Sequence, residues 1–152
     1  GLPGVRWLHN ESHLHPDLPL RLVGTSEPED ILAATAGHDL RDGRFNLALI
    51  HYPPLVHPAE RLGVHLALAG HTHGGQWRLS PRLAMHTSSD LPPAMPSGLL
   101  ALRRTRLAIA RGLGASFINL RILCPPHAPL YTLRPAGPAD PAPDRLTPLI
   151  PW

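Results

Sequence analysis

Apolar residues occur along this chain in short runs separated by Gly, Pro and charged residues. The clearest run covers residues 66–69, four apolar residues that stop at Gly70. A second run over residues 46–50 ends at His51 and is followed by two prolines, which stop a strand. Runs bounded in this way are typical of strands in a covered sheet.

The same pattern predicts further strands and two helices. Strands are expected over residues 5–8, 18–23, 99–102, 106–110, 120–122 and 130–133, with a hairpin turn at 103–105. The main helix is expected over residues 25–37, where Ser26 and Glu29 have the spacing of a capping box and Pro28 falls in the first turn. Capping also accounts for the acidic residues Glu27, Glu29 and Asp30 better than metal binding does. A shorter helix is predicted over residues 58–62.

Three segments lack a clear period. Residues 9–17 contain His9, His13 and His15, but no Cys or carboxylate completes a metal-ligand spacing, so a solvated loop is the preferred interpretation. Residues 78–98 are proline-rich and irregular. Residues 135–152 consist largely of Pro, Ala and Asp and are expected to form a flexible tail. The chain is therefore divided into a domain over residues 1–134 and a tail over residues 135–152.

Histidines follow both of the clearest strands. His51 follows the strand over residues 46–50, and His71 and His73 follow the strand over residues 66–69. Open α/β folds place their chemistry at the carboxyl ends of strands, and imidazole is the commonest metal ligand. The glycines Gly70, Gly74 and Gly75 allow the backbone to turn around these histidines. The alternative is that all three are turn residues satisfied by backbone hydrogen bonds. His65, at the strand entry, is interpreted as a surface or packing residue and not as a ligand.

These segments resemble the calcineurin-like metallophosphoesterases. The specific element is Gly-His-Thr-His-Gly-Gly-Gln at residues 70–76, which is similar to the last histidine motif of a bacterial branch of that family. Arg-Gly-Leu-Gly at residues 111–114 and Arg-x-x-x-Pro-Pro, residues 121–126 with Cys124 before the prolines, resemble two further segments of the branch. The resemblance covers residues 5–133. His127 stands where the family usually has glutamate.

The resemblance implies an α/β fold, the C-terminal half of a four-layer αββα sandwich. It also implies a binuclear centre of Mn, Zn or Fe, with His51 and His71 on one metal and His73 on the other. The family's Asp-x-His, Gly-Asp and Gly-Asn-His motifs, which carry its bridging aspartate and catalytic histidine, do not occur in these residues. We therefore expect a fragment that binds at most one metal weakly and has little activity alone.

The implied function is metal-dependent hydrolysis of a phosphomonoester, phosphodiester or pyrophosphate, with a phosphorylated small-molecule or lipid-type substrate. A non-catalytic metal-binding or interaction module on the same scaffold is the alternative. All 14 basic residues are arginine, but they are scattered and the net charge is only +3, so a nucleic-acid partner is not expected. No apolar run approaches membrane-spanning length, so no membrane segment is expected in this chain. Cytoplasmic and membrane-associated or extracytoplasmic locations both remain open.

Overall fold

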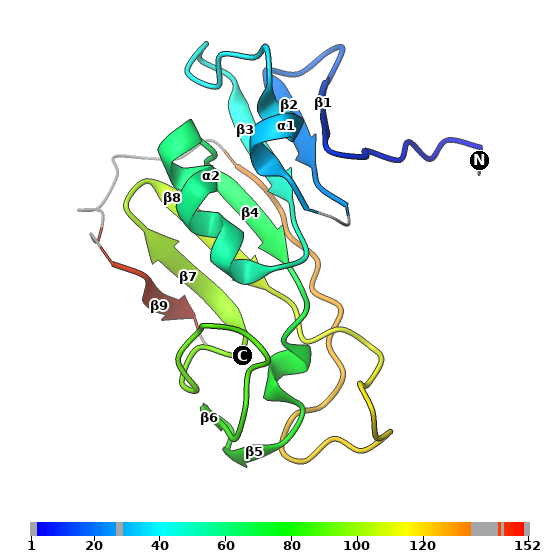
Figure 1. The fold of residues 1–152 in the computed structure, drawn as a ribbon, viewed down its shortest axis with the longest axis vertical. Coiled ribbons are helices and arrows are strands. Elements are labelled where there is room, and N and C mark those ends of the chain that lie inside the picture. Colours follow the sequence, from blue (N-terminus) through cyan, green and yellow to red (C-terminus); the bar gives the residue numbers. More distant parts are fainter. Residues whose placement is uncertain (1–2, 27–28, 135–142, 144, 151–152) are drawn as a thin grey trace.

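The protein contains one large mixed β-sheet with helices on one face. A computed structural model describes residues 3–26, 29–134, 143 and 145–150 (Figure 1). The sheet has seven strands in the order β1-β2-β3-β4-β8-β7-β9. Their bounds are β1 Glu11–Leu14, β2 Leu20–Gly24, β3 Phe45–Leu49, β4 Leu66–Ala69, β7 Gly98–Leu102, β8 Thr105–Ile109 and β9 Thr147–Ile150. A separate two-stranded sheet joins β5 Arg78–Ser80 to β6 Leu83–Ala84.

The centre of the large sheet is parallel. Strands β2, β3, β4 and β8 run in one direction, with Leu49 opposite Leu68 and Ala69 opposite Ile109. Strands β1, β7 and β9 are antiparallel to their neighbours. Because the carboxyl ends of parallel strands meet at one edge, the segments that follow β3, β4 and β8 lie close together. The fold is therefore mixed α/β, as expected, and the histidines follow strands that share an edge.

Helices cover one face of this sheet. Helix α1 Ile31–Thr35 contacts β1 and β2, and helix α2 Val56–Leu62 contacts β7 and β8 (Figure 1). A single 3₁₀ turn, η1 Pro53–Leu55, leads into α2, which ends where Gly63 adopts a left-handed conformation with φ of 97°. The core packs Ile31 and Val56 of the helices against Ala48, Ala67 and Leu107 of the strands.

Several expected elements differ from the observed ones. Residues 5–8 form no strand, whereas β1 lies within the segment expected to be a loop. The expected strands at 120–122 and 130–133 are irregular, and Ile122 makes only an isolated bridge to Trp77. In both places exposed apolar residues mimicked the strand pattern, which cannot distinguish an exposed residue from a buried one.

Helix α1 is also shorter than expected. Its N-cap is Asp30, whose side chain accepts a hydrogen bond from the backbone N–H of Ala33, so the expected capping box of Ser26 and Glu29 is not formed. Glu27 and Pro28 lie outside the described residues. The acidic side chain expected to cap the helix, Glu29, is directed to the segment after β3 instead, as described below.

Part of the segment expected to be a flexible tail is regular. Thr147–Ile150 form β9, which pairs with β7 at the edge of the sheet. Residues 135–142, 144, 151 and 152 lie outside the described part of the chain, so the division at residue 134 stays a prediction.

The second face of the sheet carries no helix among the described residues. Phe45, Leu47 and Leu49 alternate with the buried Asn46 and Ala48 along β3, and Phe45 and Leu49 are 38% and 41% exposed. Within the described ranges, no helix is long and apolar enough to cross a membrane.

Candidate metal centre

His51 and His71 meet at the carboxyl edge of the sheet. The backbone ladder between β3 and β4 continues past both strands, because Ile50 N–H donates to Leu68 and Gly70 N–H donates to His51. The two histidines therefore leave adjacent strands at the same level. Their rings lie edge to face with centroids 4.9 Å apart, and His71 Nδ1 is 3.1 Å from His51 Nε2.

The tautomer of His71 follows from its second contact. Its Nε2 lies 2.7 Å from the carbonyl oxygen of Ser88, which can only accept a hydrogen bond, so Nε2 carries the hydrogen. Nδ1 of the neutral ring is then a lone pair facing His51. A histidine that donates one N–H to a backbone carbonyl and turns the other nitrogen inward has the usual arrangement of a metal ligand.

The pair fits one divalent ion. With metal–nitrogen bonds of about 2.1 Å, two nitrogens 3.1 Å apart subtend about 95° at a shared ion, between octahedral and tetrahedral values. Among the described residues, no group of three or more His, Cys, Asp and Glu side chains comes together to hold a metal. The described chain therefore offers two nitrogens of a site that needs further ligands, from water or other groups.

Glu29 and Tyr52 support this pair. The carboxylate of Glu29 accepts the backbone N–H of His51 at 2.7 Å and that of Tyr52 at 2.8 Å, which fixes the turn that carries the His51 ring. The Tyr52 ring packs on His71 with centroids 4.2 Å apart. The sequence pattern missed both roles and that of Ser88, because these contacts join segments that are distant along the chain.

His73 makes no hydrogen bond or ring contact with His51 or His71 among the described residues. It falls in the 3₁₀ turn η2 His73–Gly75, and its Nδ1 is buried without a hydrogen-bond partner among the described residues. A buried ring nitrogen without a partner is costly unless a ligand or water satisfies it. The assignment of His73 to a metal stays a prediction.

The loop that carries His71 and His73 has an unusual backbone. His71, His73 and Gln76 have φ of 67°, 49° and 47°, and Gly74 and Gly75 have φ of 66° and 78°. Non-glycine residues rarely occupy this left-handed region, and clusters of them mark functional sites more often than ordinary turns.

The three site-shaping glycines are not equivalent. A Cβ on Gly74 would lie 2.5 Å from Arg111 Cγ and 2.8 Å from Cys124 Sγ, and one on Gly75 would collide with Ala84. At Gly70, a Cβ would meet nothing within 4 Å, and the φ of Gly70 is not left-handed. Neither space nor conformation requires a glycine at position 70, and the site-shaping role of Gly70 stays a prediction.

Two later segments of the chain hold this loop in place. Arg121 donates to the carbonyls of His73 (3.0 Å) and Arg111 (2.9 Å), and its Nε donates to Gly114 (3.0 Å). The Gln76 side chain donates to Ser116 and Ile118 and accepts the N–H of Ser116 at 2.8 Å. Residues 111–114 and 121–126, noted in the sequence as separate motifs, are thus fixed to the histidine loop through backbone carbonyls.

A concentration of positive charge lies beneath the loop. Arg78, which is buried, donates through Nε to Gly74 at 2.8 Å. Burial, with repulsion from Arg78 and Arg121, lowers the pKa of Arg111. Burial and the charge of Arg111 also lower the pKa of His127, which keeps that imidazole neutral at pH 7. This corner is therefore suited to hold negative charge close to the histidine loop.

A histidine pair at the carboxyl edge of a mixed α/β sheet is an arrangement that can supply two ligands to a divalent ion. The chain is 32% identical over 95 residues, 62% of its length, to a Bacillus subtilis (strain 168) protein named uncharacterized metallophosphoesterase YkuE. The matched stretch is 33% of that protein, so the chain spans about a third of this relative. No family model and no solved structure matches the chain. The similarity supports the metallophosphoesterase family for this chain.

Proposed function

We propose that the chain contributes to a metal-dependent phosphoesterase that hydrolyses a phosphomonoester, a phosphodiester or a pyrophosphate. The observation that carries the proposal is the contact of His51 Nε2 with His71 Nδ1, oriented from behind by the carbonyl of Ser88. The partial similarity to a protein named as a metallophosphoesterase supports the same reaction class. The substrate is a phosphorylated small molecule or lipid-type molecule.

Each side chain at the edge then has a definite task. His51 and His71 bind one divalent cation, and Glu29 and Ser88 hold the two rings in position. Where a bridging carboxylate from outside these residues completes the site, His73, whose Nδ1 has no partner among the described residues, binds a second cation. Bound divalent ions such as Mn, Zn or Fe supply charge neutralisation for the phosphoryl oxygens and a hydroxide at neutral pH. Arg111 and Arg78 add positive charge that favours an anionic substrate.

The proposed architecture is a four-layer αββα sandwich in which this sheet packs its second face on another sheet. The exposed apolar residues Phe45 and Leu49 support this arrangement, because a sheet face of this kind is normally covered. Three neutral nitrogens without a bridging carboxylate hold two cations poorly, since the cations repel each other. We therefore expect at most one weakly bound metal, and little turnover, from these residues alone.

A non-catalytic metal-binding module is the second candidate. It is favoured by the absence, over the described ranges, of any group of three ligating side chains. The two candidates make the same prediction for metal binding and different predictions for turnover.

The test is an assay of the purified chain with a chromogenic phosphodiester and a chromogenic phosphomonoester, with and without Mn²⁺ or Zn²⁺. Metal-dependent hydrolysis that His71→Ala abolishes, and that His38→Ala leaves unchanged, supports the phosphoesterase. Metal binding without turnover, even when the chain is mixed with segments that supply the missing carboxylate, supports the binding module. Turnover that survives His71→Ala contradicts the proposed site.

A further inference from the structure

A patch of exposed apolar side chains lies at the end of the molecule that carries the histidine loop. Figure 1 shows β5, β6 and the yellow-to-orange loop that follows β8 together at this end, at the bottom of the view. Six large apolar side chains are exposed there, and none of them belongs to the core. These residues, which we call the apolar tip, are Leu79, Met85, Phe117, Ile118, Leu120 and Ile122.

Backbone pairing brings half of the apolar tip onto one face. Trp77 pairs with Ile122 in a parallel bridge, and its carbonyl accepts the N–H of Met85 at 2.9 Å. The neighbouring residues Arg78 and Ala84 pair with each other and are buried. Because successive side chains of extended backbone point to opposite sides, the residues next to this buried pair point outward. Four apolar side chains therefore share the outer face, namely Trp77, Leu79, Met85 and Ile122.

A turn next to this face displays Phe117. The Phe117 side chain is fully exposed, and its φ of 60° lies in the left-handed region that non-glycine residues rarely adopt. The Gln76 side chain spans the turn, because it donates to the carbonyls of Ser116 and Ile118 (3.0 and 2.9 Å) and accepts the N–H of Ser116 at 2.8 Å. A costly backbone conformation that is held in place for a side chain left in solvent indicates a binding role.

The Trp77 indole joins the turn to the small sheet. Its Nε1 donates to the carbonyl of Leu120 at 2.9 Å, in the segment between Phe117 and Ile122. The backbone of Ile122 is fixed on the same side, because its N–H donates to the Gln76 carbonyl at 3.0 Å. The apolar tip is therefore a preformed surface, and binding through it costs little conformational entropy.

The charge of this end suits an anionic surface. Residues 70–97 and 110–127, which run through it, contain four arginines and a single acidic residue, Asp90. Arg82 is exposed in the turn between β5 and β6. Among the described residues, no carboxylate lies within ion-pair distance of Arg82, Arg111 or Arg121. Positive charge at this end is therefore available to an external partner.

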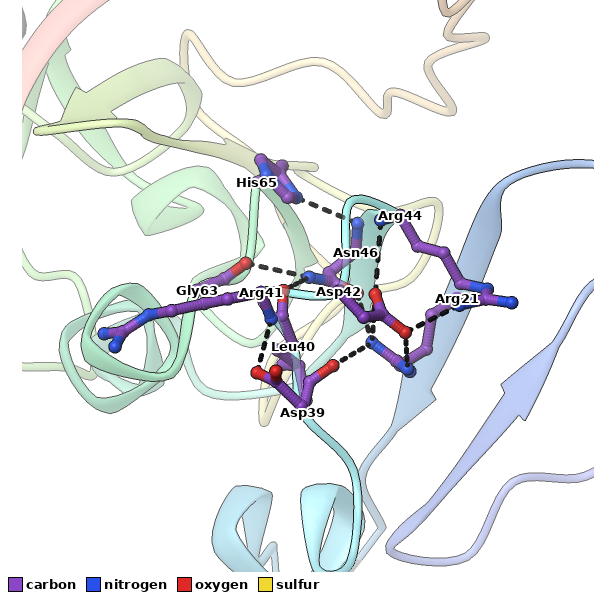
Figure 2. Close-up of polar contacts among 9 residues, drawn as sticks. All are labelled: Arg21, Asp39, Leu40, Arg41, Asp42, Arg44, Asn46, Gly63 and His65. Atoms are coloured by element: carbon purple, nitrogen blue, oxygen red, sulfur yellow. Dashed lines mark hydrogen bonds and ion pairs between the residues drawn. The ribbon is translucent and has the colours of Figure 1, made fainter.

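The loop before β3, at the opposite edge of the sheet, shows the contrast (Figure 2). There Arg21 and Arg44 donate to Asp42 Oδ2 at 2.8 and 2.7 Å, and the backbone N–H of Arg41 donates to Asp39 Oδ1 at 2.9 Å. Arginines in and beside this loop are accompanied by carboxylates, whereas those near the apolar tip are not. The exposed apolar residues and the unbalanced positive charge thus occur together.

We propose that the apolar tip docks on a membrane surface that contains anionic lipids, with Phe117 and Ile118 inserted at the headgroup level and Arg82 among the lipid phosphates. Surfaces that bind membranes peripherally combine exposed apolar side chains with cationic ones in this way. A side chain at the apex of a turn enters a deformable lipid layer without a complementary pocket. This favours a lipid surface over a folded protein as the partner.

Docking in this orientation places the histidine loop near the lipid headgroups. The loop ends at Gln76, the residue that holds the Phe117 turn, so His71 and His73 lie on the docked side of the molecule. A lipid-type substrate would then be met at the membrane surface. This consequence rests on the proposed function, but the docking itself does not.

The test measures binding of the whole chain to phosphatidylcholine vesicles with and without phosphatidylglycerol, by co-sedimentation without added metal. We expect binding that needs phosphatidylglycerol, that decreases with added salt and that is about tenfold weaker or more in Phe117→Ser. Leu32→Ser, which changes an exposed leucine of α1, is the matched control and should bind as the native chain does. Arg82→Gln should weaken binding, and Arg41→Gln should not.

Tryptophan fluorescence locates the inserted residue. Emission from Phe117→Trp should be quenched by lipids brominated in their acyl chains more strongly than emission from Leu32→Trp, which contains the same native tryptophans. Phe117→Leu should retain most of the binding, because it keeps an apolar side chain at the apex. Circular dichroism checks the fold of each variant.

His71→Ala separates this proposal from the proposed function. It should bind vesicles as the native chain does, so a chain without phosphoesterase activity that still binds supports the docking alone. The proposal is overturned if phosphatidylglycerol does not promote binding, if Phe117→Ser and Leu32→Ser bind alike, or if Phe117→Trp is quenched no more than Leu32→Trp. Phe117→Ser that dissociates oligomers and leaves vesicle binding unchanged would assign the tip to a second copy of the chain and overturn it too.

Discussion

At the scale of single residues, Asp42 shows how one ionised group organises a loop. The hydrogen bond from Arg21, followed by contacts with Arg44, lowers the pKa of Asp42 to about 2 from its ordinary 3.8. Because the folded state binds this proton less readily than the unfolded chain, the ionised carboxylate stabilises the fold. That contribution is complete above about pH 4 and is lost as the pH falls towards about 2.

Asp42→Asn tests this linkage. We expect the variant to be less stable than the native chain at pH 6, and the difference in the free energy of unfolding to shrink as the pH is lowered from about 4 to about 2. Urea unfolding at several pH values measures this difference in the free energy of unfolding. Asp17→Asn is the matched control, since Asp17 makes no ion pair within the described residues. A difference that stays constant over that pH interval would contradict the role given to Asp42.

At the scale of elements, the loop after β4 depends on positions where only glycine fits. Gly74→Ala should destabilise the fold by about 2–4 kcal/mol, because it combines a left-handed backbone with a clash against Arg111 and Cys124. Gly70→Ala is the matched control and should change stability by no more than about 0.5 kcal/mol, since a Cβ there meets open space. Urea unfolding measures the stability of both variants. Equal losses in the free energy of unfolding would contradict this geometry of the loop.

Arg121 is the second support of the same loop. Arg121→Lys keeps the charge but loses the planar fork that reaches the carbonyls of His73, Arg111 and Gly114 together. We expect a loss of about 1.5–3 kcal/mol in the free energy of unfolding and faster amide exchange over residues 71–76. Arg82→Lys serves as the control. Unchanged amide exchange over residues 71–76 in Arg121→Lys would contradict the role of Arg121 in holding this loop.

Sequence patterns predicted some elements better than others. The strands over β3, β4, β7 and β8 were confirmed, because each combines an apolar run with a definite Gly, Pro or hairpin stop. The proximity of His51 to His71 also followed from two neighbouring parallel strands. Glu29, Ser88 and Arg121 could not be assigned in this way, because their partners are backbone groups far along the chain and any residue type supplies those.

At the scale of the whole molecule, helices cover one face of the sheet, and the other face carries no helix among the described residues. Trp7, Leu22 and Leu49 line a hollow of about 280 Å³ on the open side of β2 and β3. An apolar face of this kind favours association with another surface. We therefore expect the chain to self-associate with increasing concentration.

Leu49→Glu tests the role of this face. It should shift the chain towards the monomer in sedimentation velocity, because it places a charge in the middle of the apolar face. Leu32→Glu, on the exposed side of α1, should leave the association unchanged. A native chain that is monomeric at all concentrations would show that the open face needs no partner.

The central claim is that His51 and His71 bind one cation together, and the most direct measurement is a titration of the imidazole ¹⁵N signals with Zn²⁺. We predict that His51 Nε2 and His71 Nδ1 shift together and saturate with one equivalent, that His71→Ala weakens binding at least about tenfold, and that His38→Ala binds normally. Zinc that binds equally well to His71→Ala, or that shifts only other histidines, would contradict the claim.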